Sequence, residues 1–290
     1  MIYLLLSVLA STLIFVAFKL FDRFKINTLH AIIVNYLVAC LCGVIAYEGP
    51  ASVSDVPYFP WFYYTLGLGA LFIIIFNLMA LTTQRSGLSV VSVATKMSVV
   101  IPVLFGLLYY NEELGFFKLL GIILALAAVY LASIKTKKGI SIERKNLIYP
   151  ALVFLGSGII DTSIKYLEDT YVADTDVPLF SAVIFSAAFT IGISIMLIQA
   201  VRGTFRFQLK TLIGGVALGI PNYFSIYFIV QALRSGILDS SGIFTVNNVA
   251  IVMLSTIVGI LLFKERLLRK NWLGIMLAVI SIFLVAVAKW

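Results

Sequence analysis

The stretch NEELGFFKLLGIILALAAVYLAS at residues 111–133 returns near the end of the chain as KERLLRKNWLGIMLAVISIFLVA at residues 264–286. At a constant offset of 153, the matching pairs are Glu112 with Glu265, Gly106 with Gly259, and Gly121 with Gly274. At an offset of 146, the pairs are Ser11 with Ser157 and Lys19 with Lys165. QRSG at 84–87 likewise corresponds to LRSG at 233–236. Because self-similarity in a fixed order indicates an internal repeat, the sequence predicts two similar halves.

The composition predicts a membrane protein. Of 290 residues, 62% are hydrophobic and 12% are charged, and the mean hydropathy is +1.10. Soluble domains are about half apolar and a quarter charged, so this chain is expected to be solvated by lipid. The net charge of +8 does not indicate a nucleic-acid partner, because the basic residues lie between apolar runs and form no patch with exposed aromatics.

Ten apolar runs are long enough to span a bilayer, whose core of about 30 Å requires about 20 apolar residues per helix. The predicted spans are 2–21, 28–47, 59–82, 88–109, 117–134, 147–168, 178–201, 210–232, 237–263 and 271–289. Because each half has an odd number of spans, the second half enters the membrane from the opposite side. The predicted fold is therefore an all-α membrane protein of ten transmembrane helices arranged as two inverted five-helix repeats.

The predicted organisation is a first repeat at 1–136, a basic linker at 137–146 and a second repeat at 147–290. Inverted repeats are typical of secondary transporters, which hold the substrate near the midplane between the repeats. Lys and Arg residues number fifteen in the linkers after the odd-numbered spans and three on the other side. Short basic loops stay cytoplasmic. The protein is thus expected to be a multi-pass protein of the cell membrane with both termini outside the cytoplasm.

The chain resembles the ten-span EamA-type carriers of the drug/metabolite transporter superfamily. The resemblance rests on the two-half repeat, on the elements GLLYYNEEL and GILLFKERL, and on the Leu-Gly pairs at 120–121 and 273–274. It implies alternating-access transport of small metabolites, often export, through a central cavity to which the fifth and tenth spans are peripheral. Many relatives are expected to have both termini inside, so the charge count departs from the family pattern.

Lys96 is the most informative polar residue at membrane depth. It lies eight residues after Leu88, at the start of span 88–109, which is about 12 Å into the membrane at about 1.5 Å per residue. A charge at the centre of a bilayer costs about 2.5–3.5 kcal/mol on insertion scales. Ser92 and Ser89 lie on the same helical face. We expect Lys96 to face an aqueous cavity and to bind an anionic group of the substrate; the alternative is a structural pair with a buried acid.

Asp161 is the deep carboxylate of the sixth span. It precedes Lys165 by four residues, the favourable order for an ion pair within a helix. Its counterpart in the first half is Phe15, so the repeat is not symmetric at this position, as a specific site requires. We expect Asp161 to be the counter-charge of Lys96 when the site is empty, with a simple pair to Lys165 as the alternative.

Five further polar residues complete the predicted substrate-binding set. Asn247 and Asn248 lie about ten residues into span 237–263, and Asn222 and Tyr223 follow Pro221 near the middle of span 210–232. Asn77 lies in span 59–82 and joins them as the fifth. Buried amides must be hydrogen-bonded or hydrated. They either bind substrate or join helix to helix.

The predicted function is a secondary transporter for a small polar or amphipathic metabolite, such as an amino-acid-like compound or another organic anion or zwitterion. The alternatives are an intramembrane enzyme, which requires paired carboxylates or a histidine cluster, and a channel or scaffold. We expect no enzymatic activity, no metal and no cofactor, although an ion gradient of unidentified type is expected to drive any uphill transport. The expected partners are a small-molecule substrate and the lipid bilayer, with the protein a monomer or homodimer.

Overall fold

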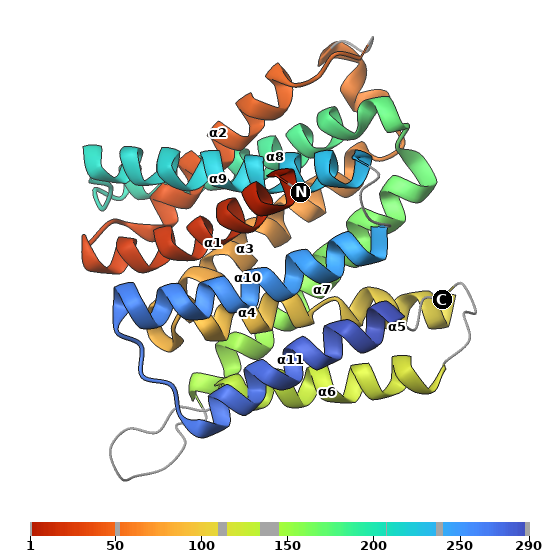
Figure 1. Ribbon diagram of the computed structural model, residues 1–290. Helices are drawn as coiled ribbons and strands as arrows, with labels where there is room; N and C mark the ends of the chain where they lie inside the picture. The colour runs from red at the N-terminus through yellow and green to blue at the C-terminus, as the bar shows by residue number, and fades with distance from the viewer. Residues whose placement is uncertain are drawn as a thin grey trace. The chain divides into compact units, whose positions relative to one another are not determined.

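The computed structural model describes residues 2–49, 53–109, 115–133, 145–206, 208–235 and 240–287, and within these ranges the chain is helical with no strand (Figure 1). The helices are α1 (Ile2–Arg23), α2 (Thr28–Ile45), α3 (Phe62–Ser86), α4 (Leu88–Met97), α5 (Val100–Tyr109), α6 (Phe116–Ser133), α7 (Lys145–Tyr171), α8 (Val177–Val201), α9 (Leu209–Arg234), α10 (Ser240–Phe263) and α11 (Arg269–Val287). Short 3-10 helices, η1 (Val53–Tyr58) and η2 (Asp174–Asp176), precede α3 and α8.

Seven of these helices are long and apolar enough to cross a membrane, and they are α1, α2, α3, α7, α8, α9 and α10. Two shorter apolar segments are also present. Leu88–Pro102 comprises α4 and the start of α5, and Leu119–Ala132 lies within α6. The predicted class of all-α, multi-pass membrane protein is therefore confirmed. The inverted relation of the two halves stays a prediction.

The predicted span 88–109 is divided into two helices, α4 and α5, which are drawn as separate coils in Figure 1. The cause is Pro102, which has no N–H to donate to the carbonyl of Ser98 four residues earlier, and whose ring crowds that carbonyl. The oxygen of Ser98 instead accepts a hydrogen bond from the N–H of Ile101 at 2.9 Å. As a result α4 is only ten residues long, and Lys96 lies in its last turn.

The described chain divides into two compact units. Unit 1 comprises Met1–Lys19, Leu78–Ile159 and Phe224–Trp290, and unit 2 comprises Leu20–Asn77 and Ile160–Tyr223. Each unit takes segments from both predicted repeats, and α1, α3, α7 and α9 each pass from one unit to the other part-way along their length. The repeat boundaries predicted from the sequence stay a prediction.

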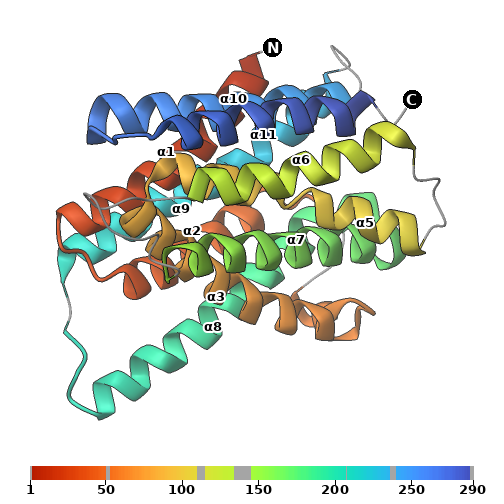
Figure 2. The same ribbon diagram turned by 90° about the horizontal axis from the view of Figure 1, so that it is seen from below.

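The core of unit 1 is built around α6 and α11, which run side by side in Figures 1 and 2. Gly274 makes their close approach feasible, because a Cβ there would lie 2.6 Å from the backbone nitrogen of Ala132. Buried side chains of α4 and α10, among them Met97 and Val252, complete this core. Small residues at helix contacts are how helices associate in lipid, where van der Waals packing replaces the hydrophobic effect.

Unit 2 is organised by the pairing of α2 with α8. A Cβ on Gly192 of α8 would lie 2.5 Å from the side chain of Ile33 on α2, so the two helices require a glycine at this contact. Tyr36 is fully buried, and its hydroxyl donates to the carbonyl of Phe72 at 2.7 Å. This bond ties α2 to α3 and satisfies a polar group that would otherwise be costly to bury.

Candidate functional site

The seven predicted binding residues belong to both compact units. Unit 1 contains Lys96, Asn247 and Asn248; unit 2 contains Asn77, Asp161, Asn222 and Tyr223. The assignment of all seven to one site stays a prediction.

Lys96 is half-buried, one residue before the end of α4. On its face, the hydroxyl of Ser92 donates to the carbonyl of Ser89 at 3.0 Å, while the hydroxyl of Ser89 has no hydrogen-bond partner among the described residues. A cation at a helix C-terminus gains up to about 2 kcal/mol in a partly buried site. This is less than the insertion cost of about 2.5–3.5 kcal/mol, so other groups facing the ammonium must supply the remainder.

Asn247 and Asn248 lie on α10, which packs against α4 within unit 1. Asn248 is half-buried, whereas Asn247 is only 5% exposed. The side-chain oxygen of Asn247 accepts no hydrogen bond from any residue that the structure describes. A buried acceptor left unpaired costs about 1–3 kcal/mol, which makes Asn247 a candidate for a donor group supplied from outside the protein.

Asn222 is hydrogen-bonded to another helix. Its side-chain nitrogen donates to the side-chain oxygen of Asn35 on α2 at 3.1 Å, and both residues are buried. One turn earlier on α9, a Cβ on Gly219 would lie 3.0 Å from the carbonyl oxygen of Asn35, so the two backbones are in close contact. This is an amide pair of the kind that joins membrane helices. Asn35, an amide within an apolar run, is a residue that the sequence reasoning missed.

The remaining predicted residues of unit 2 have varied surroundings. The side-chain nitrogen of Asn77 donates to the carbonyl of Ile73 within α3 at 2.7 Å. Asp161 is exposed and Tyr223 is half-buried. His30, which lies at the start of α2, is buried, and its Nε2 forms a hydrogen bond of 2.7 Å with the side-chain oxygen of Gln199. Within the described part of the chain, no group of three or more His, Cys, Asp or Glu residues is placed to hold a metal ion.

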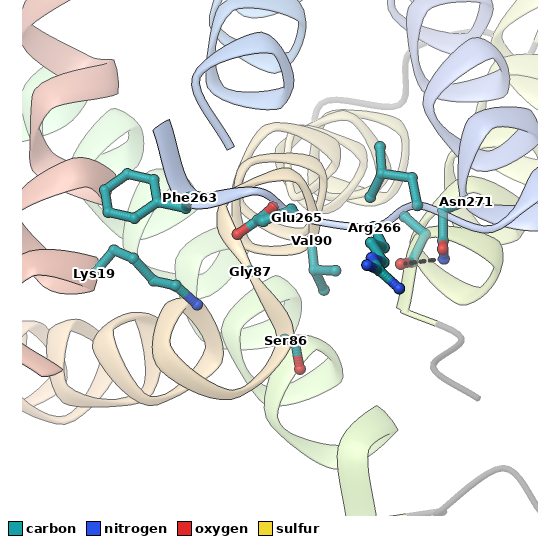
Figure 3. A pocket seen from close by; sticks show the side chains of 10 residues that line it. Lys19, Ser86, Gly87, Val90, Phe263, Glu265, Arg266 and Asn271 are labelled. Atoms are coloured by element: carbon teal, nitrogen blue, oxygen red, sulfur yellow. Dashed lines mark hydrogen bonds between the residues drawn. The ribbon is translucent and has the colours of Figure 1, made fainter. Parts of the chain in front are cut away.

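A cavity of about 230 Å³ lies in unit 1 beside the turn between α3 and α4 (Figure 3). It is lined by residues of α1, of the α3–α4 turn, of α4, of α6, of the end of α10, of the α10–α11 connection and of the start of α11, namely Lys19, Ser86, Gly87, Val90, Ala132, Phe263, Glu265, Arg266, Leu267 and Asn271. These residues were not among the predicted site residues. Charged and amide side chains that line this cavity form hydrogen bonds with backbone groups at the ends of several helices.

Glu265 caps the N-terminus of α4. Gly87 is the single residue between α3 and α4, and its φ of 108° and ψ of 170° form a conformation open in practice only to glycine. Because glycine has no side chain, α4 has no cap of its own. An oxygen of the Glu265 carboxylate accepts the N–H of Leu88 at 2.8 Å. The carboxylate is thereby placed at the partly positive end of the helix, where an anion is stabilised.

The C-terminus of α3 at the same turn is capped by a cation. The ammonium of Lys19 donates to the carbonyls of Thr83 and Gln84, with N···O distances of 3.3 and 3.4 Å. Figure 3 shows the side chain of Lys19 extending from α1 towards this turn. A positive charge is favourable here because the last carbonyls of a helix carry partial negative charge.

Asn271, in the first turn of α11, caps the end of α6 and the start of its own helix. Its side-chain nitrogen donates to the carbonyls of Leu131 and Ala132 at the end of α6, at 3.0 and 2.9 Å. Its side-chain oxygen accepts the N–H of Leu268 at 2.7 Å, just before α11. Side chains thus satisfy backbone groups that helix ends leave unpaired.

The signal for this arrangement was present in the repeat. Lys19, Gly87, Gly259 and Glu265 are all positions with a match in the other half of the chain. The matches alone indicate a repeat. The additional signal is their chemistry, because an ammonium, a carboxylate and two glycines next to predicted helix ends are the residue types that cap helices.

Comparison with known proteins shows what the chain is similar to. Residues 1–134 match the model of the EamA-like transporter family. A protein of Haemophilus influenzae, named only "Uncharacterized protein", is 28% identical over 291 residues, which cover 97% of this chain and 96% of the relative. A protein solved by crystallography shares the fold with a TM-score of 0.62 at 15% identity, over 99% of this chain and 96% of the other. At that identity the likeness shows the fold alone.

The fold is that of a multi-pass membrane protein, and the family match over residues 1–134 supports a membrane transporter. Residues 1–134 thus resemble the EamA-like transporter family, and over these residues the resemblance predicted from the sequence is confirmed.

Proposed function

We propose that the protein is a secondary carrier that moves a small polar or amphipathic organic anion or zwitterion across the membrane by alternating access, with export as the direction. The family match supports carrier activity in general. The observation that carries the choice of substrate class is Lys96, an ammonium group on a short helix in the interior of a strongly apolar chain.

The chemistry of Lys96 suits a role in binding. The end of α4 stabilises the ammonium by up to about 2 kcal/mol, and an ammonium at membrane depth attracts anionic groups. A carboxylate or phosphate on the substrate would supply additional stabilisation during transport. Lys96 thereby acts as the anion anchor, and a ligand that binds one conformation more tightly biases the conformational equilibrium.

The neighbouring helix α10 supports a second polar contact. Its Asn247 has a buried side-chain oxygen without a hydrogen-bond partner in the ranges that the structure describes. Such an acceptor suits an ammonium or hydroxyl group of the substrate. A cation on α4 and a vacant acceptor on α10 are together suited to a zwitterion or a hydroxylated anion.

Counterflow into liposomes tests this function. The purified protein is reconstituted into liposomes loaded with an unlabelled metabolite mixture, and isotope-labelled mixture is added outside. A carrier accumulates labelled substrate transiently above its equilibrium level, and the accumulated compounds are expected to be anions or zwitterions. A channel would equilibrate the label without accumulation, and an enzyme would return the label in chemically altered compounds. Either of these results would contradict the proposal.

A further inference from the structure

The start of α4 depends on a group from a distant part of the sequence. The first N–H groups of a helix have no partner within the helix, and Gly87 offers no side chain to satisfy them. Ser86 and Ser89 flank Gly87, but their buried hydroxyls have no hydrogen-bond partner in the described part of the chain. The N–H of Leu88 is instead satisfied by Glu265, which lies 177 residues away in the sequence.

Two glycines leave the space that the Glu265 carboxylate occupies. A Cβ on Gly87 would lie 2.6 Å from one carboxylate oxygen, and a Cβ on Gly259 would lie 2.6 Å from the other. The backbone N–H of Glu265 also donates to the carbonyl of Gly259 at 3.0 Å, which directs the chain back towards α10. A side chain at either glycine position would therefore crowd the carboxylate.

The carboxylate of Glu265 lies beside a cavity and is not enclosed in the apolar core. Glu265 is half-buried and borders the cavity of about 230 Å³ shown in Figure 3. One water occupies about 30 Å³ of liquid, so this volume accommodates several. A carboxylate that leaves Leu88 can therefore be hydrated, whereas a carboxylate in a dry core would be held permanently by its desolvation cost. A bond that is strong when formed and replaceable by water is suited to repeated opening.

The helix held by this bond is a short segment between two interruptions of the helical backbone. It begins at the Gly87 turn and ends at the break caused by Pro102, and its ten residues carry Lys96 one residue from the end. At about 1.5 Å per residue, α4 is about 15 Å long. A displacement at Leu88 is therefore transmitted along one rigid segment to Lys96.

We propose that Glu265 is a positioning residue of the transport cycle, which latches the start of α4 in the conformation described here and must release Leu88 when the carrier changes conformation. This proposal rests on the proposed carrier function. Glu265 acts through α4 and does not itself contact the substrate. A hydrogen bond to a charged group is strong enough that its loss shifts a two-state equilibrium by about tenfold or more.

Distance measurement between two spin labels tests the latch without any substrate. Cys40 and Cys42 are free thiols and are replaced by alanine; Arg85 and Arg269, both exposed and both in unit 1, are replaced by cysteine and labelled. Double electron–electron resonance on the full-length protein in lipid nanodiscs then reports the distance between the α3–α4 turn and the start of α11. The loss of the Arg85 side chain is common to all samples.

The parent protein is expected to show one dominant distance. Glu265→Ala should increase a second distance population by about tenfold, and Glu265→Gln should increase it less, because the amide oxygen still accepts the N–H of Leu88 without the charge. Ser281→Ala is the matched control, since it removes a hydrogen bond from α11 to the carbonyl of Gly121 on α6 within the same unit, away from both labelled positions; it should lower thermal stability and leave the distances unchanged.

Retention of the parent distance distribution by both Glu265 variants would overturn the proposal and leave Glu265 as a static helix cap. If Glu265→Ala does not fold, Glu265→Gln decides the question by the same criterion. Because the readout needs no transport, a failure of counterflow would count against the carrier function and would not be confused with a failure of the latch.

Discussion

Replacement of Gly87 by alanine is expected to destabilise the protein by about 2.5–6 kcal/mol. A non-glycine residue forced into the conformation of Gly87, with φ of 108°, costs about 1–3 kcal/mol. The added Cβ would also lie 2.6 Å from the nearest oxygen of Glu265, so the carboxylate must move away from Leu88. Loss of that hydrogen bond adds a cost of about 1.5–3 kcal/mol.

A double-mutant cycle separates these two contributions. Glu265→Ala alone should cost about 1.5–3 kcal/mol, and the double mutant Gly87→Ala/Glu265→Ala should cost no more than Gly87→Ala alone, because the same hydrogen bond cannot be lost twice. Gly67→Ala is the matched control on exposed helical backbone, where an added Cβ meets nothing within 4 Å. It should be neutral or stabilise the protein by up to about 1 kcal/mol.

The assay is reversible unfolding in mixed micelles of a mild detergent and dodecyl sulfate, followed by circular dichroism. The expected result is a double mutant that is less destabilised than the sum of the two single variants by about 1.5–3 kcal/mol. Additive costs would show that the carboxylate of Glu265 is not seated against Gly87, and the reasoning on the α4 cap would then be refuted.

Three further predictions concern unit 2 and the topology. Asn222→Ala should lower the free energy of unfolding by about 0.6–1.7 kcal/mol, non-additively with Asn35→Ala in the same assay; additive effects would contradict the pairing. Gly69→Ala should cost about 1–3 kcal/mol, because its Cβ would lie 2.7 Å from a backbone nitrogen of α8; an unchanged stability would contradict this contact. In a protein whose native cysteines have been replaced, an impermeant thiol reagent added to intact cells should label Ser54→Cys but not Thr204→Cys. The reverse labelling pattern would place both termini in the cytoplasm.

The helices were predictable because lipid imposes a simple rule on the sequence. Uninterrupted apolar runs of about 20 residues must form helices to satisfy their backbone groups, and the predicted ends lie within a few residues of those observed. The effect of Pro102 on the carbonyl of Ser98 was also foreseeable. The complete division into α4 and α5 was not, because membrane helices tolerate proline through local adjustment of the backbone.

Contacts between distant segments were not predictable from spacing. Asn222 was recognised as either a binding residue or a helix-packing residue, but its partner Asn35 depends on the relative positions of α2 and α9, which close glycine contacts determine. Glu265 likewise meets Leu88 across 177 residues. Lys96 was placed by its depth alone, whereas its position in the last turn of a short helix follows from the division of the span.

Counterflow by Lys96 variants tests the central claim most directly, once the labelled mixture has identified a transported compound. Lys96→Ala is expected to abolish uptake of an anionic substrate, and Lys96→Arg should transport poorly, because a forked guanidinium does not replace a compact ammonium. Lys165→Ala, which removes an exposed lysine from α7, serves as the control for loss of one positive charge and should retain transport. Uptake by folded Lys96→Ala at the rate of the parent protein would contradict the anion-anchor role.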